Sequence, residues 1–162
     1  EEAADWLIAP VEQTIRQRLG TLIFGSDADT LESVMLADLN QRGETLSVVE
    51  YGTGGRLAGK LSQVMGFGKS AFAAGNLLGS QDEVDLIELA HRAANQSHAN
   101  WGLACVVEGG DGAMQLGVGI WHENYCQQRR RGFGGHAALA PEWSSNVAMD
   151  GLRKLLAAAK PK

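Results

Sequence analysis

The fold is decided by the stretch LSVVEYGTGG, residues 46–55, in which an apolar segment runs into a glycine-rich turn. Residues 46–50 contain Val48 and Val49, which favour a strand. Four residues from Gly52 to Gly55 predict a turn, and residues 56–64 have the spacing of a helix. The N–H groups at the start of such a helix point together and favour an anion.

Strands and helices alternate on both sides of this stretch. We expect helices over residues 3–19, from a capping box at Asp29 and Glu32 to Gly43, from a second capping box at Ser80 and Glu83 to Ser97, and over 143–159. We expect strands over residues 21–24, 71–78 (buried) and 103–107, and a hairpin of 114–121 and 124–133. This order predicts an α/β fold, a three-layer α/β/α sandwich with a mixed sheet.

Composition excludes several classes of protein. The chain has 162 residues, enough for one domain, with 44% hydrophobic and 20% charged residues. A net charge of -5 argues against a general nucleic-acid binder and against adsorption to anionic membranes, and no apolar run could span a bilayer. Only 2 cysteines are present, which suits the cytoplasm. Because the chain begins Glu1-Glu2-Ala3, we expect a fragment or a processed form of a longer protein.

Other possible functional groups are weaker signals. The segment Gly66–Ser70 ends like a phosphate-binding loop but lacks its first glycine, so Lys69 is interpreted as a surface residue. His91 and His98 lie two helical turns apart, whereas His122 and Cys126 flank the hairpin turn; we expect no metal site. Cys105 is expected to be buried and unreactive. In Arg129-Arg130-Arg131, strand alternation predicts that the outer two share one face, either as a solvated strand end or as an anion site.

From Ala3 to Leu156 the chain resembles the C-terminal domain of the competence/damage-inducible CinA proteins, which are similar to nicotinamide mononucleotide deamidases. Residues 46–55 resemble the family signature Leu-Thr-hydrophobic-Ala-Glu-Ser-Cys-Thr-Gly-Gly. Its ligand-binding positions are matched by Glu50, Thr53, Gly54 and Gly55. The stretch Trp101–Ala104 and the segment Phe133-Gly134-Gly135 match later strands. The resemblance implies a connector over residues 1–43, the deamidase-like domain over 44–162, one compact unit, and an upstream CinA-type domain.

The departures from the family fall on its reactive groups. Tyr51 stands at the position of the serine nucleophile, and Gly52 replaces the cysteine. The segment that carries the family's tyrosine and base lysine is missing; in an alternative alignment Ser80 and Asp85 stand in their places. Val106-Val107 replaces a Thr-Gly pair, and the arginine expected after the last strand is replaced near Ala137. A serine-type nucleophile needs an adjacent base and oxyanion donors, so we assign no catalytic residue.

Three functional hypotheses remain open. The first is a degenerate CinA-type domain without deamidase activity, which retains a weakened pocket for a pyridine nucleotide and has a regulatory or structural role. The second is an active nicotinamide-nucleotide amidase that uses other groups, such as Glu50, Tyr51 or Asp82. The third is an interaction module that helps an upstream domain to dimerise. No cofactor is implied. Four tryptophans in a chain with 6% aromatic residues favour a homodimer, although Trp101 fits the core.

Overall fold

The computed structural model describes residues 2–64, 70–79, 85–110 and 113–159, and in these it has one five-stranded sheet in the order β2-β1-β3-β4-β5. The strands are β1 (Leu46–Tyr51), β2 (Phe72–Leu78), β3 (Trp101–Gly110), β4 (Ala113–His122) and β5 (Tyr125–Phe133). β1 pairs in parallel with β2 and β3, whereas β3, β4 and β5 are antiparallel. The sheet is therefore mixed, as predicted.

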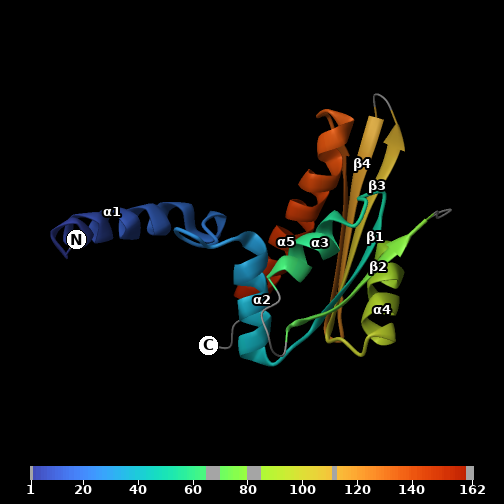
Figure 1. Cartoon of the computed structure of the whole chain (residues 1–162), viewed down its shortest axis with the longest axis horizontal. Helices are drawn as coiled ribbons and strands as arrows, with labels where there is room; N and C mark the ends of the chain where they lie inside the picture. The colour runs from blue at the N-terminus through green and yellow to red at the C-terminus, as the bar shows by residue number, and fades with distance from the viewer. Residues whose placement is uncertain (1, 65–69, 80–84, 111–112, 160–162) are drawn as a thin grey trace.

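Helices cover both faces of the sheet (Figure 1). α2 (Leu31–Arg42), α3 (Arg56–Gln63) and α5 (Ala140–Ala158) lie on one face, and α4 (Leu86–Gln96) lies on the other. The larger core, between the sheet and the first group of helices, contains Met35, Leu103 and Leu152 among its fully buried residues. A smaller core beneath α4 contains Val49 and Ala104. This arrangement confirms the three-layer α/β/α prediction.

The connections place the glycine-rich turn at a reversal of strand order. From β1 the chain passes through α3 to β2 on one side, and through α4 it then reaches β3 on the other side of β1. In open α/β sheets, ligands bind at the carboxyl ends of strands where the order reverses in this way. The turn after β1 is therefore the natural first place to look for a site.

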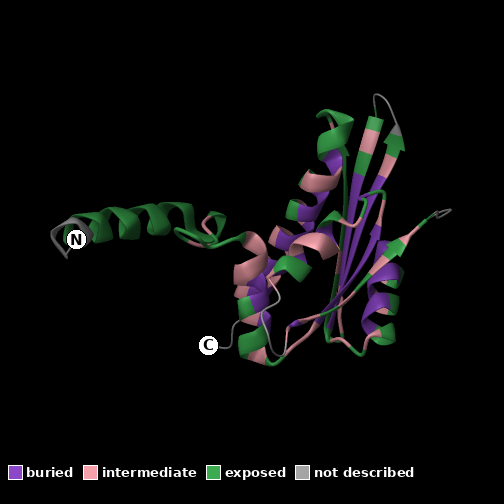
Figure 2. Ribbon diagram, in the orientation of Figure 1, coloured by how far each residue is buried: buried purple, intermediate pink, exposed green. Residues whose placement is uncertain are grey.

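The first helix stands apart from the sandwich. α1 (Glu2–Leu19) confirms the predicted helix over residues 3–19, but it projects away from the rest of the chain and is exposed from Trp6 to Leu19 (Figures 1 and 2). Trp6 is 79% exposed, and Leu7, Val11 and Ile15 are exposed as well. The short helix η1 (Gly20–Leu22) follows, and Arg153 of α5 donates to the carbonyl oxygen of Thr21 at 2.6 Å.

Two predictions in the N-terminal part were wrong in detail. Residues 21–24 do not form a strand, because the segment turns in η1 and its carbonyl at Thr21 bonds to α5 rather than to a neighbouring strand. The capping box lies one residue later than predicted. Thr30 accepts from the N–H of Ser33, and the Ser33 hydroxyl accepts from the N–H of Thr30, whereas Asp29 accepts from the N–H of Ser26. The helix ends at Gly43, as predicted.

Two predictions in the middle of the chain also need correction. β2 is not a buried strand, because it lies at the edge of the sheet and its residues alternate between exposed and half-buried. α4 begins at Leu86, where Asp85 accepts from the N–H groups of Ile87 and Glu88. The expected start at Ser80 and Glu83 lies outside the described residues.

The other elements agree with the sequence. Strand β1, helix α3, the buried strand β3 and the β4–β5 hairpin confirm their predictions, and the last helix begins at Ala140 with Pro141 in its first turn. α2, which falls within the predicted connector, packs on α5. The division of the chain at residue 43 stays a prediction. None of the helices in the described ranges combines the length and the apolar character that crossing a bilayer requires.

Candidate functional site

The turn after β1 depends on glycine for its shape. Gly52, Gly54 and Gly55 have φ of 69°, 63° and 78°, in the left-handed region that other residues rarely adopt. At Gly52 the chain also touches β3, because a Cβ there would lie 2.1 Å from the carbonyl oxygen of Val107. The turn therefore packs directly against β3, and only glycine fits at its first position.

Glu50 closes the turn from within. Its side chain is 1% exposed, and its carboxylate accepts from the N–H of Leu57 at 2.9 Å, from the N–H of Ala58 at 2.7 Å and from the hydroxyl of Thr53 at 2.6 Å. These two N–H groups belong to the first turn of α3, where a helix has free donors and a partial positive charge. The carboxylate thus occupies donors at which an external anion would bind.

A thiol and a hydroxyl lie close to Glu50 in the core. Burial raises the pKa of the Cys105 thiol to about 12, a hydrogen bond with Ser144 opposes this shift, and the nearby charge of Glu50 adds to it. The thiolate is the nucleophilic form of cysteine, and it is not populated at neutral pH with such a pKa. The expectation that Cys105 is buried and unreactive is consistent with this environment.

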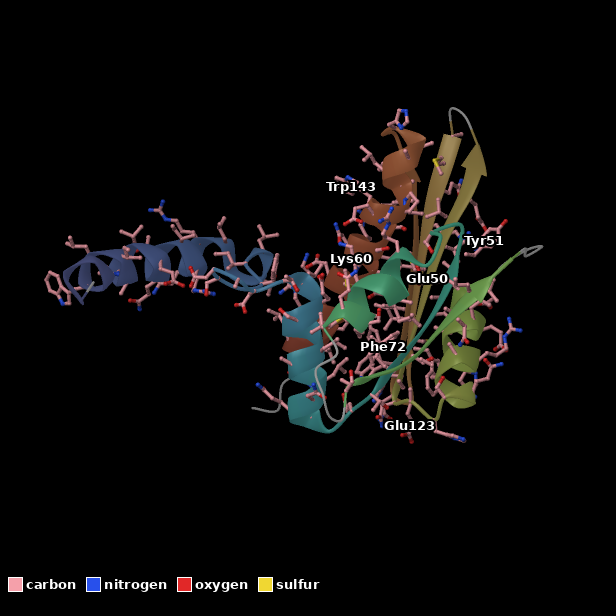
Figure 3. All side chains as sticks on the ribbon, viewed as in Figure 1. Glu50, Tyr51, Lys60, Phe72, Glu123 and Trp143 are labelled. Atoms are coloured by element: carbon pink, nitrogen blue, oxygen red, sulfur yellow. The ribbon has the colours of Figure 1, made fainter. Side chains whose placement is uncertain are left out.

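Tyr51 lies on the other face of the sheet. Because side chains alternate along a strand, Glu50 faces α3, whereas the half-buried Tyr51 packs against the core beneath α4. Figure 3 shows Glu50 beside α3 and Tyr51 on the opposite side of β1. The fold therefore separates the residue at the family's nucleophile position from the carboxylate that precedes it.

Basic groups after the turn point toward α5. Lys60, one turn into α3, forms an ion pair with Glu142 at 2.5 Å and donates to the side-chain oxygen of Asn146 at 3.1 Å. Arg56 is exposed and lies 3.9 Å from the Glu142 carboxylate. Both cations thus lie on the α5 side of the sheet, away from Tyr51.

The histidines are spread over the surface of the sandwich. His91 stacks on Trp121 with ring centroids 4.5 Å apart, and His122 stacks on Trp101 at 4.3 Å. Across the hairpin His122 pairs with Tyr125, so Cys126 lies opposite Trp121 instead. Within the ranges that the structure describes, no three His, Cys, Asp or Glu side chains are grouped to hold a metal ion.

Three cavities among the described residues lie away from the turn. Their volumes are about 300 Å³ between α5 and β5, about 460 Å³ between α2 and α5, and about 630 Å³ between η1, α3 and α5. The residues around them include neither Glu50, Tyr51 nor the glycines of the turn. Arg129 and Arg131 line the first of these cavities, whereas Arg130 pairs with Glu108 at 2.9 Å.

The structure therefore brings together part of the predicted site. Glu50 and Thr53 are bonded to each other, and Gly54 and Gly55 shape the helix start above them. Ligand binding by these residues stays a prediction. Lys69 and Asp82 lie outside the described residues. Lys154 and Asp150 of α5, which face the arginines of β5, were not predicted; their spacing of four residues is visible in the sequence, but their position opposite β5 is not.

No family model matches the chain. A CinA-like protein from Acaryochloris marina is 33% identical over 137 residues, which cover 71% of this chain and 32% of that protein. A CinA-like protein from Gloeobacter violaceus is 37% identical over 142 residues, covering 74% of this chain and 33% of that protein. The chain thus spans about a third of the length of these curated relatives.

The fold also matches solved structures. A crystal structure described as a competence-damaged protein (CinA) superfamily protein from Enterobacter cloacae aligns with a TM-score of 0.66. Sequence identity is 17%, and the alignment covers 83% of this chain and 96% of that chain. At this identity the match shows the fold alone.

Proposed function

Because this chain belongs to the CinA-like family, we propose that it is a CinA-type C-terminal domain of the cytoplasm that lacks amide-hydrolysing activity and has a binding, regulatory or structural role. The observation that carries the proposal is where the matches to the family signature, and the departures from it, lie around the turn. Glu50, Thr53 and Gly55, which match the family signature, build the turn, and Gly52, a departure from the signature, also fits the turn. Tyr51, the departure at the nucleophile position, lies on the other face of the sheet.

The placement of Tyr51 supports the loss of chemistry. Hydrolysis of an amide by a hydroxyl nucleophile needs a base within hydrogen-bond reach and donors for the oxyanion. Tyr51 packs against the apolar core beneath α4, whereas Lys60 is bonded to Glu142 and Asn146 on the α5 side. A phenol in an apolar contact, with the sheet between it and this lysine, lacks the arrangement that the reaction needs.

The state of the other buried groups points the same way. Every buried side-chain nitrogen and oxygen of the described residues has a hydrogen-bond partner. Catalytic centres often hold groups with perturbed pKa values in a cleft. Here the perturbed thiol of Cys105 is fully buried, and its pKa is shifted away from the reactive form. The alternative, an active nicotinamide-nucleotide amidase with a rearranged site, would need a base that these residues do not supply.

The test is an assay of the purified chain with nicotinamide mononucleotide. We expect no ammonia release above the uncatalysed rate, and no activity in Tyr51→Ser, because restoring the hydroxyl restores no base. Calorimetric titration with the same nucleotide separates a retained pocket from a purely structural role. Ammonia release at an ordinary enzymatic rate, by either protein, would show that a working base exists and would refute the proposal.

We also propose that the chain forms a homodimer through the exposed apolar face of α1. Leu7, Val11 and Ile15 recur at helical spacing, and their side chains are exposed. Charge favours a second copy in the antiparallel direction: α1 has Glu12 in its middle and Arg16 and Arg18 in its last turn. Arg16 pairs with Glu12 of its own helix at 2.7 Å, and an antiparallel partner brings the end of the chain that carries Glu2 and Asp5 close to Arg18.

Light scattering of Val11→Asp tests this interface, with Gln13→Asp on the polar side as the matched control. We expect the mass of a dimer for the unmodified chain and for the control, and the mass of a monomer for Val11→Asp, since burial of a charge in an apolar interface is unfavourable. A monomeric mass for the unmodified chain at micromolar concentration, or a dimer that survives Val11→Asp, would contradict it.

A further inference from the structure

Two arginines of β5 form one wall of the cavity between α5 and β5. The cavity has a volume of about 300 Å³, at the lower end of the range for small-molecule sites. Arg129 and Arg131 lie on the face of β5 that points toward α5, opposite Val118 and Leu116 of β4. Their spacing of two residues puts the two side chains about 7 Å apart along the strand, close enough for both guanidinium groups to reach one anion.

Arg130 gives an internal comparison on the same strand. It lies on the opposite face of the sheet, where its guanidinium pairs with Glu108 at 2.9 Å. No ion pair joins Arg129 or Arg131 to a carboxylate of the described residues. The amide oxygen of Gln127, in its better orientation, accepts from Arg129 at 2.8 Å and is neutral. The positive charges of the two cavity arginines are therefore not balanced by a carboxylate of the described residues.

The opposite wall of the cavity contains one carboxylate that is shared by two cations. Asp150 pairs with Lys154 at 2.6 Å and with the buried Arg153 at 2.6 Å. Burial raises the pKa of the Asp150 carboxyl, but hydrogen bonds from Lys154 and Arg153 outweigh burial and hold that pKa below its ordinary value of 3.8. Asp150 is thus ionised and is shared between Lys154 and Arg153, so this wall keeps a charge of about +1, which adds to the charges of Arg129 and Arg131.

The bottom of the cavity is apolar. Val118 and Ile120 of β4 and Leu155 of α5 line it, and Ile120 is 2% exposed. A bare inorganic anion would leave this surface uncovered, whereas a neutral apolar molecule would leave the guanidinium groups without a partner. The combination matches a molecule with an anionic head and a small apolar body.

We propose that the α5–β5 cavity is a binding site for a small organic anion, a phosphate monoester or carboxylate with an apolar body. Arg129 and Arg131 bind the anionic head, and Val118, Ile120 and Leu155 contact the body. The competing explanation is that arginines on an edge strand only keep it from pairing with another sheet. That role requires only outward-facing charges, on either face of the strand. It therefore predicts that substitution of Arg130 and substitution of its two neighbours have the same effect on anion binding.

The experiment uses phenyl phosphate as the probe and follows backbone amide signals by NMR titration. We expect saturable shifts at β5 and α5, weaker shifts with inorganic phosphate, and none with benzyl alcohol. In Arg129→Gln/Arg131→Gln the affinity for phenyl phosphate should fall at least about tenfold, since hydrogen bonds to charged groups are lost. The matched control Arg130→Gln should keep the affinity within about twofold.

Three results would overturn the proposal: no saturable shift at β5 or α5 at millimolar phenyl phosphate, unchanged affinity in Arg129→Gln/Arg131→Gln, or an equal loss in Arg130→Gln. Folding of each variant is checked in the same spectra from the amide signals of α4, on the other face of the sheet. Benzoate in place of phenyl phosphate distinguishes a carboxylate site from a phosphate site. The turn after β1 does not line this cavity, so the outcome is independent of the ammonia assay.

Discussion

Substitution of Glu50 by glutamine tests whether its carboxylate closes the turn. The side chain keeps its size, but one of its two oxygens becomes an NH₂ group, which cannot accept from the N–H that faces it. Leu57 and Ala58 donate to different oxygens at 2.9 and 2.7 Å, so one backbone donor must lose its partner. Hydrogen bonds to charged groups contribute roughly 1.5–3 kcal/mol each, and a buried donor left alone adds a penalty.

We therefore expect Glu50→Gln to lower the free energy of unfolding by about 2–4 kcal/mol, a large share of the roughly 5–15 kcal/mol typical of a domain. Thr53→Val, which removes the hydroxyl that donates to Glu50 at 2.6 Å, should cost about 1–2 kcal/mol. Because the two residues share a bond, the double variant should lose less than the sum of the single losses.

Urea denaturation followed by circular dichroism measures these differences. Glu123→Gln is the matched control, because Glu123 is exposed in the β4–β5 turn and a surface change of this kind is worth at most about 0.5 kcal/mol (Figure 3). If Glu50→Gln unfolds at the same urea concentration as Glu123→Gln, the carboxylate does not satisfy the helix donors. The turn would then be open to an external anion.

Other substitutions follow from packing and charge. Gly102→Ala should destabilise the fold by more than about 3 kcal/mol in the same urea assay, since its Cβ would lie 1.8 Å from a carbonyl oxygen of α4; Gly59→Ala meets nothing within 4 Å and should stabilise α3 by about 0.5–1 kcal/mol. The lowered pKa of Asp150 means that its stabilising contribution is complete above pH 3.8 and is lost as the pH falls through the folded value; thermal unfolding of Asp150→Asn should lack that part of the acid dependence. Iodoacetamide should label the exposed Cys126 in the native protein and Cys105 only after unfolding, because burial holds the Cys105 pKa at about 12; mass spectrometry of the labelled peptides checks this.

The spacing of apolar residues correctly predicted those elements that depend least on contacts with distant parts of the chain. Val48 and Val49 indicate a strand wherever they are placed, and the turn residues from Gly52 onward can hardly form anything else. The segment at Thr21 shows the limit of this reasoning. Its apolar residues suit a strand, but none of the strands in the described part of the chain pairs with it, and a buried arginine of α5 bonds to its carbonyl oxygen instead. Tertiary contacts of this kind leave no mark in local sequence.

Helix starts were ambiguous for a related reason. Asp29 and Thr30 can both cap a helix, and the choice depends on which partner three residues later returns the bond; here Ser33 does so for Thr30. The role of Glu50 was likewise hidden. Its motif indicated a site, but only the path of the chain through Gly52 and Gly55 shows that α3 begins directly over the carboxylate.

A turn that binds its own carboxylate does not need a ligand to be stable. Ligands raise the stability of a protein only through sites that they occupy in the folded state. If phenyl phosphate raises the midpoint of thermal unfolding, the increase should disappear in Arg129→Gln/Arg131→Gln and persist in Thr53→Val, although Thr53→Val lowers the starting midpoint. The reverse pattern would assign the anion to the helix start of α3 and would mean that Glu50 yields its donors to a ligand. The two variants together thus show whether an anion binds at the helix start of α3 or in the cavity between α5 and β5.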